Sequence, residues 1–181
     1  MLEIIHVLFY IETIIWLFPI TFMFHGLEEI ITVENFITKY KNKVRETFLV
    51  KLTLTIKKNL GAKSAQLSIS IAWILLFISF IAFMTVCLLP IGANFLLFTA
   101  TLNVFFIQSF SHIGQTIIFR SYTPGVITAL FIVIPYSFLT YYRLFELGFI
   151  DGHLLFKSIP LSILMVPIFL IGNLLGRKLI R

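Results

Sequence analysis

The sequence predicts an all-α, polytopic membrane protein, a helix bundle with about five transmembrane helices. Two observations predict it. Hydrophobic residues make up 59% of the 181 residues and charged residues 12%, and the hydrophobic residues occur in runs of about twenty, the length that spans a bilayer core of about 30 Å. Within a bilayer the backbone must satisfy its own hydrogen bonds, which favours helices over open sheets. We therefore expect a single integral membrane domain over residues 1–181, in the cell membrane.

The apolar runs place the five helices near residues 4–24, 66–89, 93–119, 124–142 and 154–176. The first run is the least regular, because Glu12 lies near its middle, where a carboxyl group is costly. In the last run, Pro160 and Pro167 predict kinks. Gly172 and Gly176, four residues apart, would permit close helix packing there.

The positive charges predict the orientation of the chain in the membrane. Most of the 14 Lys and Arg residues fall between the first two runs, after the third or after the fifth. Arg143 and Lys157 fall on the opposite side. Because basic residues are enriched in cytoplasmic loops, we expect the N-terminus outside and the C-terminus in the cytoplasm.

A basic amphipathic cytoplasmic segment is expected at about residues 34–64. Tyr40, Val44, Phe48 and Leu52 recur at four-residue spacing, with Lys and Arg between them, a pattern that suits a helix on anionic lipid headgroups. A solvated topology anchor would explain the pattern equally well. Since this segment carries most of the net charge of +6, the charge does not indicate nucleic-acid binding. Membrane lipids are the expected partners, and a homo-oligomer is an open alternative.

The clearest chemical signal is His25-Gly26-Leu27-Glu28-Glu29, where the first apolar run meets the basic segment. In a helix, residues three and four apart share a face, so His25 can meet both carboxylates. The same residues also suit a polar helix end at the membrane border, with Glu28 and Glu29 hydrated. The motif alone does not decide between a site and a helix end.

The third run adds a polar stripe that favours a site. Gln108, His112 and Gln115 are spaced four and three residues apart on an otherwise apolar helix. A lone intramembrane histidine often only bonds a neighbouring helix, but His112 is expected at a depth similar to that of His25. Asn103 is about half a turn away in angle, and we expect it to serve helix packing.

Two imidazoles and one or two carboxylates suit a divalent metal such as Zn, Fe or Mn. Cys87 is the single cysteine, which excludes a multi-thiolate site. The expected ligands are His25, Glu28 and His112, with Glu29 as catalytic base or further ligand. Without a metal, the same groups would form a proton relay or a structural ion pair.

Residues 120–125 read Arg-Ser-Tyr-Thr-Pro-Gly and join the third and fourth runs. The composition predicts a tight turn in which Thr123 caps the fourth helix and Pro124 occupies its first turn. Arg120 is either a topology charge or a contact for an anionic group of a substrate. Gln108 and Gln115 are further possible substrate contacts.

Together these features resemble a family of bacterial and archaeal membrane proteins named for an HXXEE motif. The resemblance rests on the motif after Trp16-Leu17-Phe18-Pro19, on His112, and on the 120–125 turn followed by Thr128. It covers roughly residues 16–135. It implies His25, Glu28, Glu29 and His112 as the residues to test, and it implies no established reaction.

Three functions are consistent with these residues. The favoured one is a metal-dependent hydrolase of a lipid-like substrate near the cytoplasmic face. The second is a small transporter or proton-coupled permease that uses the same cluster and Glu12 along a path, which would need polar access from both faces. The third is a noncatalytic membrane scaffold in which the motif stabilises the bundle.

Overall fold

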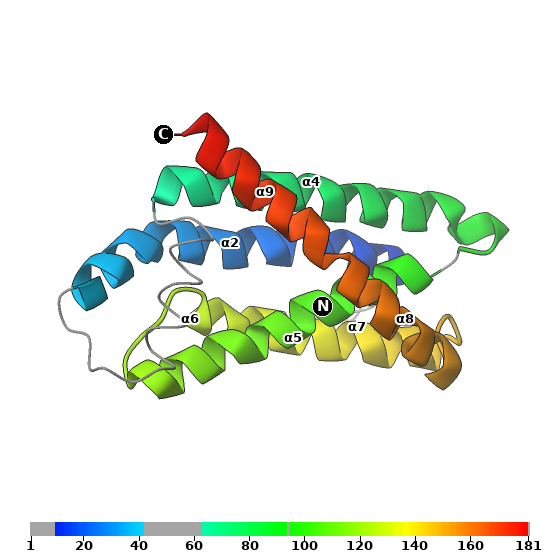
Figure 1. Ribbon diagram of the computed structural model, residues 1–181. Helices are drawn as coiled ribbons and strands as arrows, with labels where there is room; N and C mark the ends of the chain where they lie inside the picture. Colours follow the sequence, from blue (N-terminus) through cyan, green and yellow to red (C-terminus); the bar gives the residue numbers. More distant parts are fainter. Residues whose placement is uncertain (1–9, 42–62, 94, 181) are drawn as a thin grey trace, which may run out of the picture.

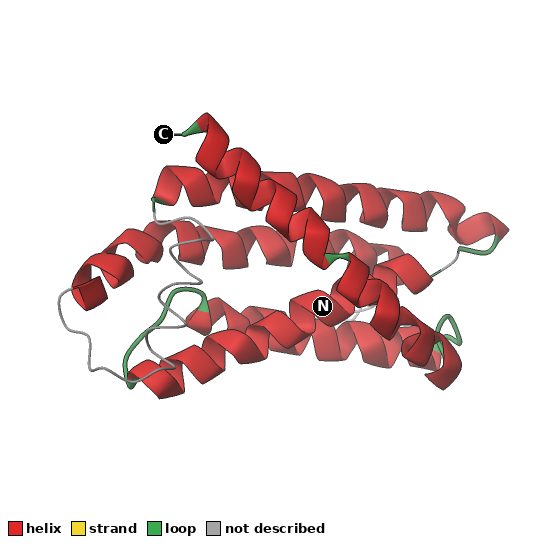
Figure 2. Ribbon diagram, in the orientation of Figure 1, coloured by secondary structure: helices red, strands yellow, loops and turns green. Residues whose placement is uncertain are grey.

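The computed structural model describes residues 10–41, 63–93 and 95–180, and within these ranges all regular secondary structure is helical (Figure 1, Figure 2). Five segments are long and apolar enough to cross a membrane, namely Ile11–Lys39, Ser64–Ile91, Leu96–Phe119, Val126–Glu146 and Gly152–Leu179. The prediction of an all-α membrane protein with five spans agrees with this finding. The orientation of the termini stays a prediction.

The first described helix, α2 (Ile11–Lys41), is longer than the sequence predicts. The His-Gly-Leu-Glu-Glu motif therefore lies inside a continuous helix, beyond residue 24 where the predicted span ends, and of the two alternatives left open by the sequence it is not a helix end. Within the motif, Gly26 lets α4 approach closely, because a Cβ atom there would lie 2.6 Å from Ile71 Cγ2. Glu12 lies in the first turn of α2 with an exposed side chain, so its expected place in the middle of a span is also wrong.

The predicted amphipathic segment at 34–64 is only partly described. Residues 34–41 continue α2, and residues 42–62 lie outside the described part of the chain. At the near end of the next helix, the amide of Ser64 donates to Glu34 Oε1 at 2.7 Å and its hydroxyl to the Ile30 carbonyl at 2.7 Å. These bonds join the start of the second span to the end of the first.

The helix α4 (Ser64–Leu88), which leads into the short 3-10 helix η1 (Leu89–Ile91), packs between α2 and α9 (Val166–Leu179). The two α9 glycines make this packing close. Ser70 Oγ donates to the Gly172 carbonyl at 3.1 Å, and a Cβ atom on Gly176 would collide with the Gln66 carbonyl. The predicted small-residue packing is confirmed.

The fifth span is two helices, α8 (Gly152–Leu164) and α9, joined at Met165. Pro167 lies in the first turn of α9, where its missing amide hydrogen is harmless. Pro160 lies inside α8 without ending it. The helix α8 packs against α5 (Leu96–Phe119) while α9 packs against α4, so the pair runs diagonally across the bundle (Figure 1).

The fourth span contains α6 (Val126–Thr128), a π-helical segment η2 (Ala129–Val133) and α7 (Ile134–Glu146). Its α7 part is tied to α2 by Tyr136, whose hydroxyl donates to the Ile14 carbonyl at 3.0 Å. The core lies where α2, α4, α5 and α7 meet. There Phe18 is fully buried, with its ring 5.5 Å from that of Phe98 and 6.0 Å from that of Tyr136.

Candidate metal centre

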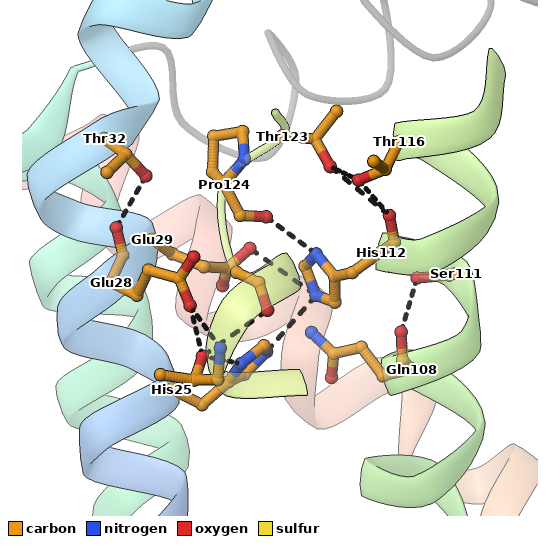
Figure 3. Close-up of polar contacts among 12 residues, drawn as sticks. His25, Glu28, Glu29, Thr32, Gln108, Ser111, His112, Thr116, Thr123 and Pro124 are labelled. Atoms are coloured by element: carbon orange, nitrogen blue, oxygen red, sulfur yellow. Dashed lines mark hydrogen bonds and ion pairs between the residues drawn. The ribbon is translucent and has the colours of Figure 1, made fainter. Parts of the chain in front are cut away.

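Two histidines from different helices face each other inside the bundle. His25 of α2 is 2% exposed and His112 of α5 is 3% exposed. Their Nε2 atoms lie 3.2 Å apart, with the two rings nearly perpendicular (Figure 3). The sequence predicts a similar depth for the two residues, and in the structure they are in direct contact.

The partner of His112 assigns the proton on its ring. His112 Nδ1 lies 2.9 Å from the Pro124 carbonyl oxygen, which can only accept a hydrogen bond. Nδ1 is therefore the donor, and in the neutral ring the Nε2 atom carries a lone pair. The turn that supplies this carbonyl is also held to α5 by Thr123, whose hydroxyl is hydrogen-bonded to the Thr116 hydroxyl at 2.6 Å.

The partner of His25 assigns its ring in the same way. His25 Nδ1 lies 2.9 Å from Thr128 Oγ1, and that hydroxyl donates its proton to Glu28 Oε2 in a short hydrogen bond. Because the hydroxyl donates its only proton to the carboxylate, it accepts a hydrogen bond from His25 Nδ1. The Nε2 atom of neutral His25 therefore also carries a lone pair.

Two lone pairs consequently point at the same place. A hydrogen bond between the two Nε2 atoms requires one proton more than two neutral rings carry, and the same position could instead hold a cation. Two nitrogen ligands of a tetrahedral zinc ion, each about 2.0–2.1 Å from it, lie about 3.3 Å apart. The observed separation of 3.2 Å is close to this spacing.

Glu29 supplies the third ligand type. Its carboxylate oxygen Oε1 lies 3.7 Å from His112 Nε2. Together His25, Glu29 and His112, here named the His–Glu cluster, offer one ligand atom each within 4.8 Å of one another. Two imidazoles and a carboxylate form a donor set that zinc, iron and manganese accept.

Glu28 has a different environment from Glu29. Its carboxylate accepts from Tyr122 Oη at 2.7 Å, from the Ile127 amide at 3.2 Å and from the Thr128 amide at 2.7 Å, besides the Thr128 hydroxyl. It thus caps the N-terminus of α6 from another helix, where a negative charge is favoured. The sequence predicts Glu28 as a ligand, whereas in the structure its carboxylate is joined to His25 through the Thr128 hydroxyl and is not part of the group formed by His25, Glu29 and His112.

Tyr122 stays a donor to that carboxylate over a wide pH range. Burial, followed by its hydrogen bond to Glu28, raises the pKa of Tyr122 from 10.0 to about 12. The phenol proton is therefore held on the oxygen that points at Glu28. The sequence around Tyr122 does not indicate this role, because its partner Glu28 is 94 residues away.

The turn between α5 and α6 differs in detail from the predicted one. Thr123 was expected to cap the fourth helix, but the cap residue is Gly125 with φ +87°, and Thr123 bonds α5 instead. A Cβ atom on Gly125 would lie 2.9 Å from the rings of both His25 and His112. Glycine is needed here for its backbone angle and to make room for the two rings.

A cleft of about 1230 Å³ borders the His–Glu cluster. Glu29 and His112 line it, as do Gln108, Ser111 and Gln115 of α5. Gln108 and Gln115 therefore lie beside the cluster, and their role as substrate contacts stays a prediction. Arg120, the C-cap of α5 with φ 47°, is exposed and is not among the described residues that line the cleft.

Comparison with known protein families matches residues 16–140 to the family described as "Protein of unknown function with HXXEE motif". The chain belongs to this HXXEE family. No curated protein and no solved structure gives a match.

In this HXXEE protein the three residues that name the motif have three environments. His25 faces His112, Glu28 binds the start of α6, and Glu29 lies beside His112 at the cleft. The spacing explains the division, because His25 and Glu29 are four residues apart on one helix face and Glu28 is turned toward α6. The motif thus joins α2 to both α5 and α6.

Proposed function

We propose that this protein is a divalent-metal-dependent hydrolase that acts on a lipid-like substrate within the membrane. The observation that carries the proposal is the convergence of two imidazole lone pairs, 3.2 Å apart, beside the Glu29 carboxylate. A cation is the group that this arrangement accommodates best. His25, His112 and Glu29 are the proposed ligands.

The number of ligands supports catalysis over a purely structural metal site. Structural zinc sites usually have four protein ligands, whereas catalytic sites have three and leave a position for water or substrate. The His–Glu cluster offers three. A bound metal lowers the pKa of a water molecule and polarises a carbonyl group, which is the chemistry that hydrolysis needs.

Glu29 has a second role in this proposal. Its side chain is 18% exposed and lines the cleft, so a substrate in the cleft reaches Glu29 and His112 before the buried His25. A carboxylate in this position can take a proton from the attacking water. Glu28 is a positioning residue, because it acts on His25 through Thr128.

A second candidate, a proton-coupled transporter, is favoured by the same distance. At 3.2 Å, the two Nε2 atoms can also share one proton as an imidazole–imidazolium pair. Proton flux in proteoliposomes that is lost in His25→Ala and in His112→Ala would support this candidate over the hydrolase.

Metal analysis of detergent-purified protein tests the main proposal. The parent, loaded with Zn²⁺, Fe²⁺ or Mn²⁺ and then desalted, should retain a stoichiometric amount of metal. His25→Ala, His112→Ala and Glu29→Gln should lose it while remaining folded by circular dichroism and size-exclusion chromatography. His153→Ala is the matched control, because His153 is exposed on α8 outside the cluster and its loss should change nothing.

Folded parent protein without stoichiometric metal under these conditions would overturn the metal assignment. Retention of metal by His112→Ala would overturn the ligand assignment. For the hydrolytic step, metal-loaded parent should cleave a fluorogenic long-chain acyl ester in mixed micelles, and the metal-free protein should not.

A further inference from the structure

The cleft beside the His–Glu cluster is walled by several helices and is mostly apolar. Its lining includes side chains from α2, α4, α5, α7, α8 and α9. Its volume of about 1230 Å³ exceeds the common range for small-molecule sites, roughly 300–1,000 Å³. The cleft therefore has room for a long ligand, and its polar groups must determine how that ligand lies.

We propose that the cleft binds a lipid with a single hydrocarbon chain and a neutral, carbonyl-bearing head group. The head lies against Glu29 and His112, and the chain runs along α5 toward Asn103. This inference rests on the proposed function for the reaction, but the binding of the lipid is a separate claim with its own test.

The head-group end is marked by polar side chains that face the cleft. Gln108, Ser111 and Gln115 lie on the same face of α5 as His112. In Figure 3 the Gln108 side chain points toward the two histidines. Gln115 Oε1 is buried with no hydrogen-bond partner among the described residues. A carboxamide in this state needs a polar ligand, since an unsatisfied buried polar group costs about 1–3 kcal/mol.

The opposite end of the cleft also contains polar residues, but they satisfy one another. Asn103 donates to Ser158 Oγ at 2.7 Å and to Ser162 Oγ at 3.2 Å, and it accepts from the Tyr141 hydroxyl at 2.5 Å. These four residues, here named the Asn103 network, leave the Asn103 amide with partners for both its oxygen and its nitrogen. A polar head group gains little there, so the head is assigned to the Gln115 end.

Between the two ends the cleft suits a hydrocarbon chain. His112 and Asn103 are nine residues apart on α5, a rise of about 13 Å. Val104 and Ile107 of α5, with Ile159 and Ile163 of α8, line the cleft. The chemistry of the head end is amide and hydroxyl rather than guanidinium, which favours an ester or amide carbonyl over a phosphate.

With an acyl ester as substrate, the proposed reaction needs only the ester and water. The water oxygen forms a bond to the carbonyl carbon, and the ester C–O bond to the alcohol breaks. A proton from water ends on the alcohol oxygen. The products are a fatty acid and an alcohol.

Photolabelling in proteoliposomes tests the binding claim. The probe is a monoacylglycerol with a diazirine in its chain, and peptide mass spectrometry locates the label. Lysophosphatidic acid with the same diazirine chain tests the head group. The informative variant is Gly114→Leu. Gly114 lines the cleft and a Cβ atom there meets nothing within 4 Å, so a larger side chain can start at this position and occupy part of the cleft. Leucine also has the higher helix propensity, so the variant should fold.

We expect monoacylglycerol to label cleft residues such as Val104, Ile159 and Ile163, and labelling to fall about tenfold in Gly114→Leu. Gly152→Leu is the matched control, because Gly152 is also helical and open but lies outside the described cleft lining. Its labelling should equal that of the parent.

Two results would overturn the inference: label confined to outward residues such as Phe80 and Phe131, or equal labelling in Gly114→Leu and the parent. Stronger labelling by the phosphate-bearing probe would overturn the neutral head group. Because Gly114→Leu should still bind metal, these failures are distinguishable from failure of the metal proposal.

Discussion

The helix α5 contributes to two buried polar clusters, and the two differ in which groups their hydrogen bonds join. The Asn103 network consists of neutral groups that pair with one another. In the His–Glu cluster, the outer partners of both imidazoles direct the lone pairs of His25 and His112 at each other. Burial of polar groups in an apolar bundle is thus common to both clusters. What distinguishes the candidate site is that it brings two imidazoles and the Glu29 carboxylate together, whereas the Asn103 network contains only neutral amide and hydroxyl groups.

The largest effect on the His–Glu cluster is expected from Gly125→Ala. The φ of +87° makes alanine strained, and the methyl group would meet both imidazoles at 2.9 Å. We expect a loss of stability of about 1–3 kcal/mol from the backbone, together with loss of stoichiometric metal. Thermal unfolding and metal analysis measure the two effects.

Gly92→Ala separates those two effects. Gly92 has a similar φ of +91°, but a Cβ atom there meets nothing within 4 Å. It should lose stability and keep its metal. Metal retained in Gly125→Ala would show that the two rings have more room than the described contacts allow.

Glu28→Gln should weaken metal binding without removing it. The amide cannot accept all the hydrogen bonds that the carboxylate accepts from Tyr122, Ile127 and Thr128. Thr128 then no longer has a fixed hydroxyl direction, and His25 loses its orientation. Loss of such outer partners typically costs about 10–100-fold in metal affinity, measurable by competition with a chelator.

The comparison with Glu29→Gln sharpens this prediction. If Glu29 is a ligand and Glu28 is not, Glu29→Gln should lower affinity more than Glu28→Gln. The reverse order would exchange their roles and restore the sequence-based assignment of Glu28 as a ligand.

Asn103→Ala should lower stability and leave metal binding unchanged, in contrast to Glu28→Gln, which should weaken metal binding. It removes the contacts to Ser158, Ser162 and Tyr141, and hydrogen bonds between membrane helices average about 0.6 kcal/mol with a maximum of about 1.7. Thermal unfolding should show a loss in this range, while metal content stays that of the parent. A variant with normal stability and lost metal would remove the distinction between the two clusters.

The smallest effect is a pH dependence from Tyr122. The folded chain holds the phenol proton more tightly than the unfolded chain, since its pKa is raised from 10.0 to about 12. The stability from this residue is therefore present below pH 10 and is lost as the pH rises toward 12. Tyr122 is 41% exposed, so solvent screening keeps the effect small.

Thermal unfolding of the parent and Tyr122→Phe across this pH range measures the effect. The difference in stability between them should shrink as the pH rises. Tyr142→Phe, which changes an exposed tyrosine on α7, is the control. A pH-independent difference for Tyr122→Phe would contradict the contact with Glu28.

Sequence patterns predicted the five spans because hydrophobic length is a local property. They also predicted that His25 and His112 lie at one depth. They did not predict that α2 continues through the motif, because the apolar run that marks the span ends near residue 24 whereas the helix continues to Lys41. Nor could they divide the roles of Glu28 and Glu29, since both residues are within one helical turn of His25 and the amides that bind Glu28 are about 100 residues away.

The turn after α5 shows the same limit. A threonine before a proline favours a helix cap. Instead, the Thr123 hydroxyl is hydrogen-bonded to Thr116 and to the His112 carbonyl, and Glu28 of α2 caps α6. Long-range hydrogen bonds replaced a local preference of similar energy. Which of these hydrogen bonds forms depends on the arrangement of the helices and cannot be predicted from the local sequence.

The π-helical segment Ala129–Val133 sets the rotational phase of the fourth span. An extra residue in a helical turn rotates everything beyond it by about 100° relative to a regular α-helix. Thr128, before the segment, reaches Glu28 on α2, and Tyr136, after it, reaches Ile14 on the same helix. In a regular α-helix of the same residues, Thr128 and Tyr136 would be eight residues apart and would differ by about 80° in direction, so the helix could keep one of these two contacts with α2 and not both. The irregular turn thus lets a single helix be anchored to the candidate centre and to the hydrophobic core at once.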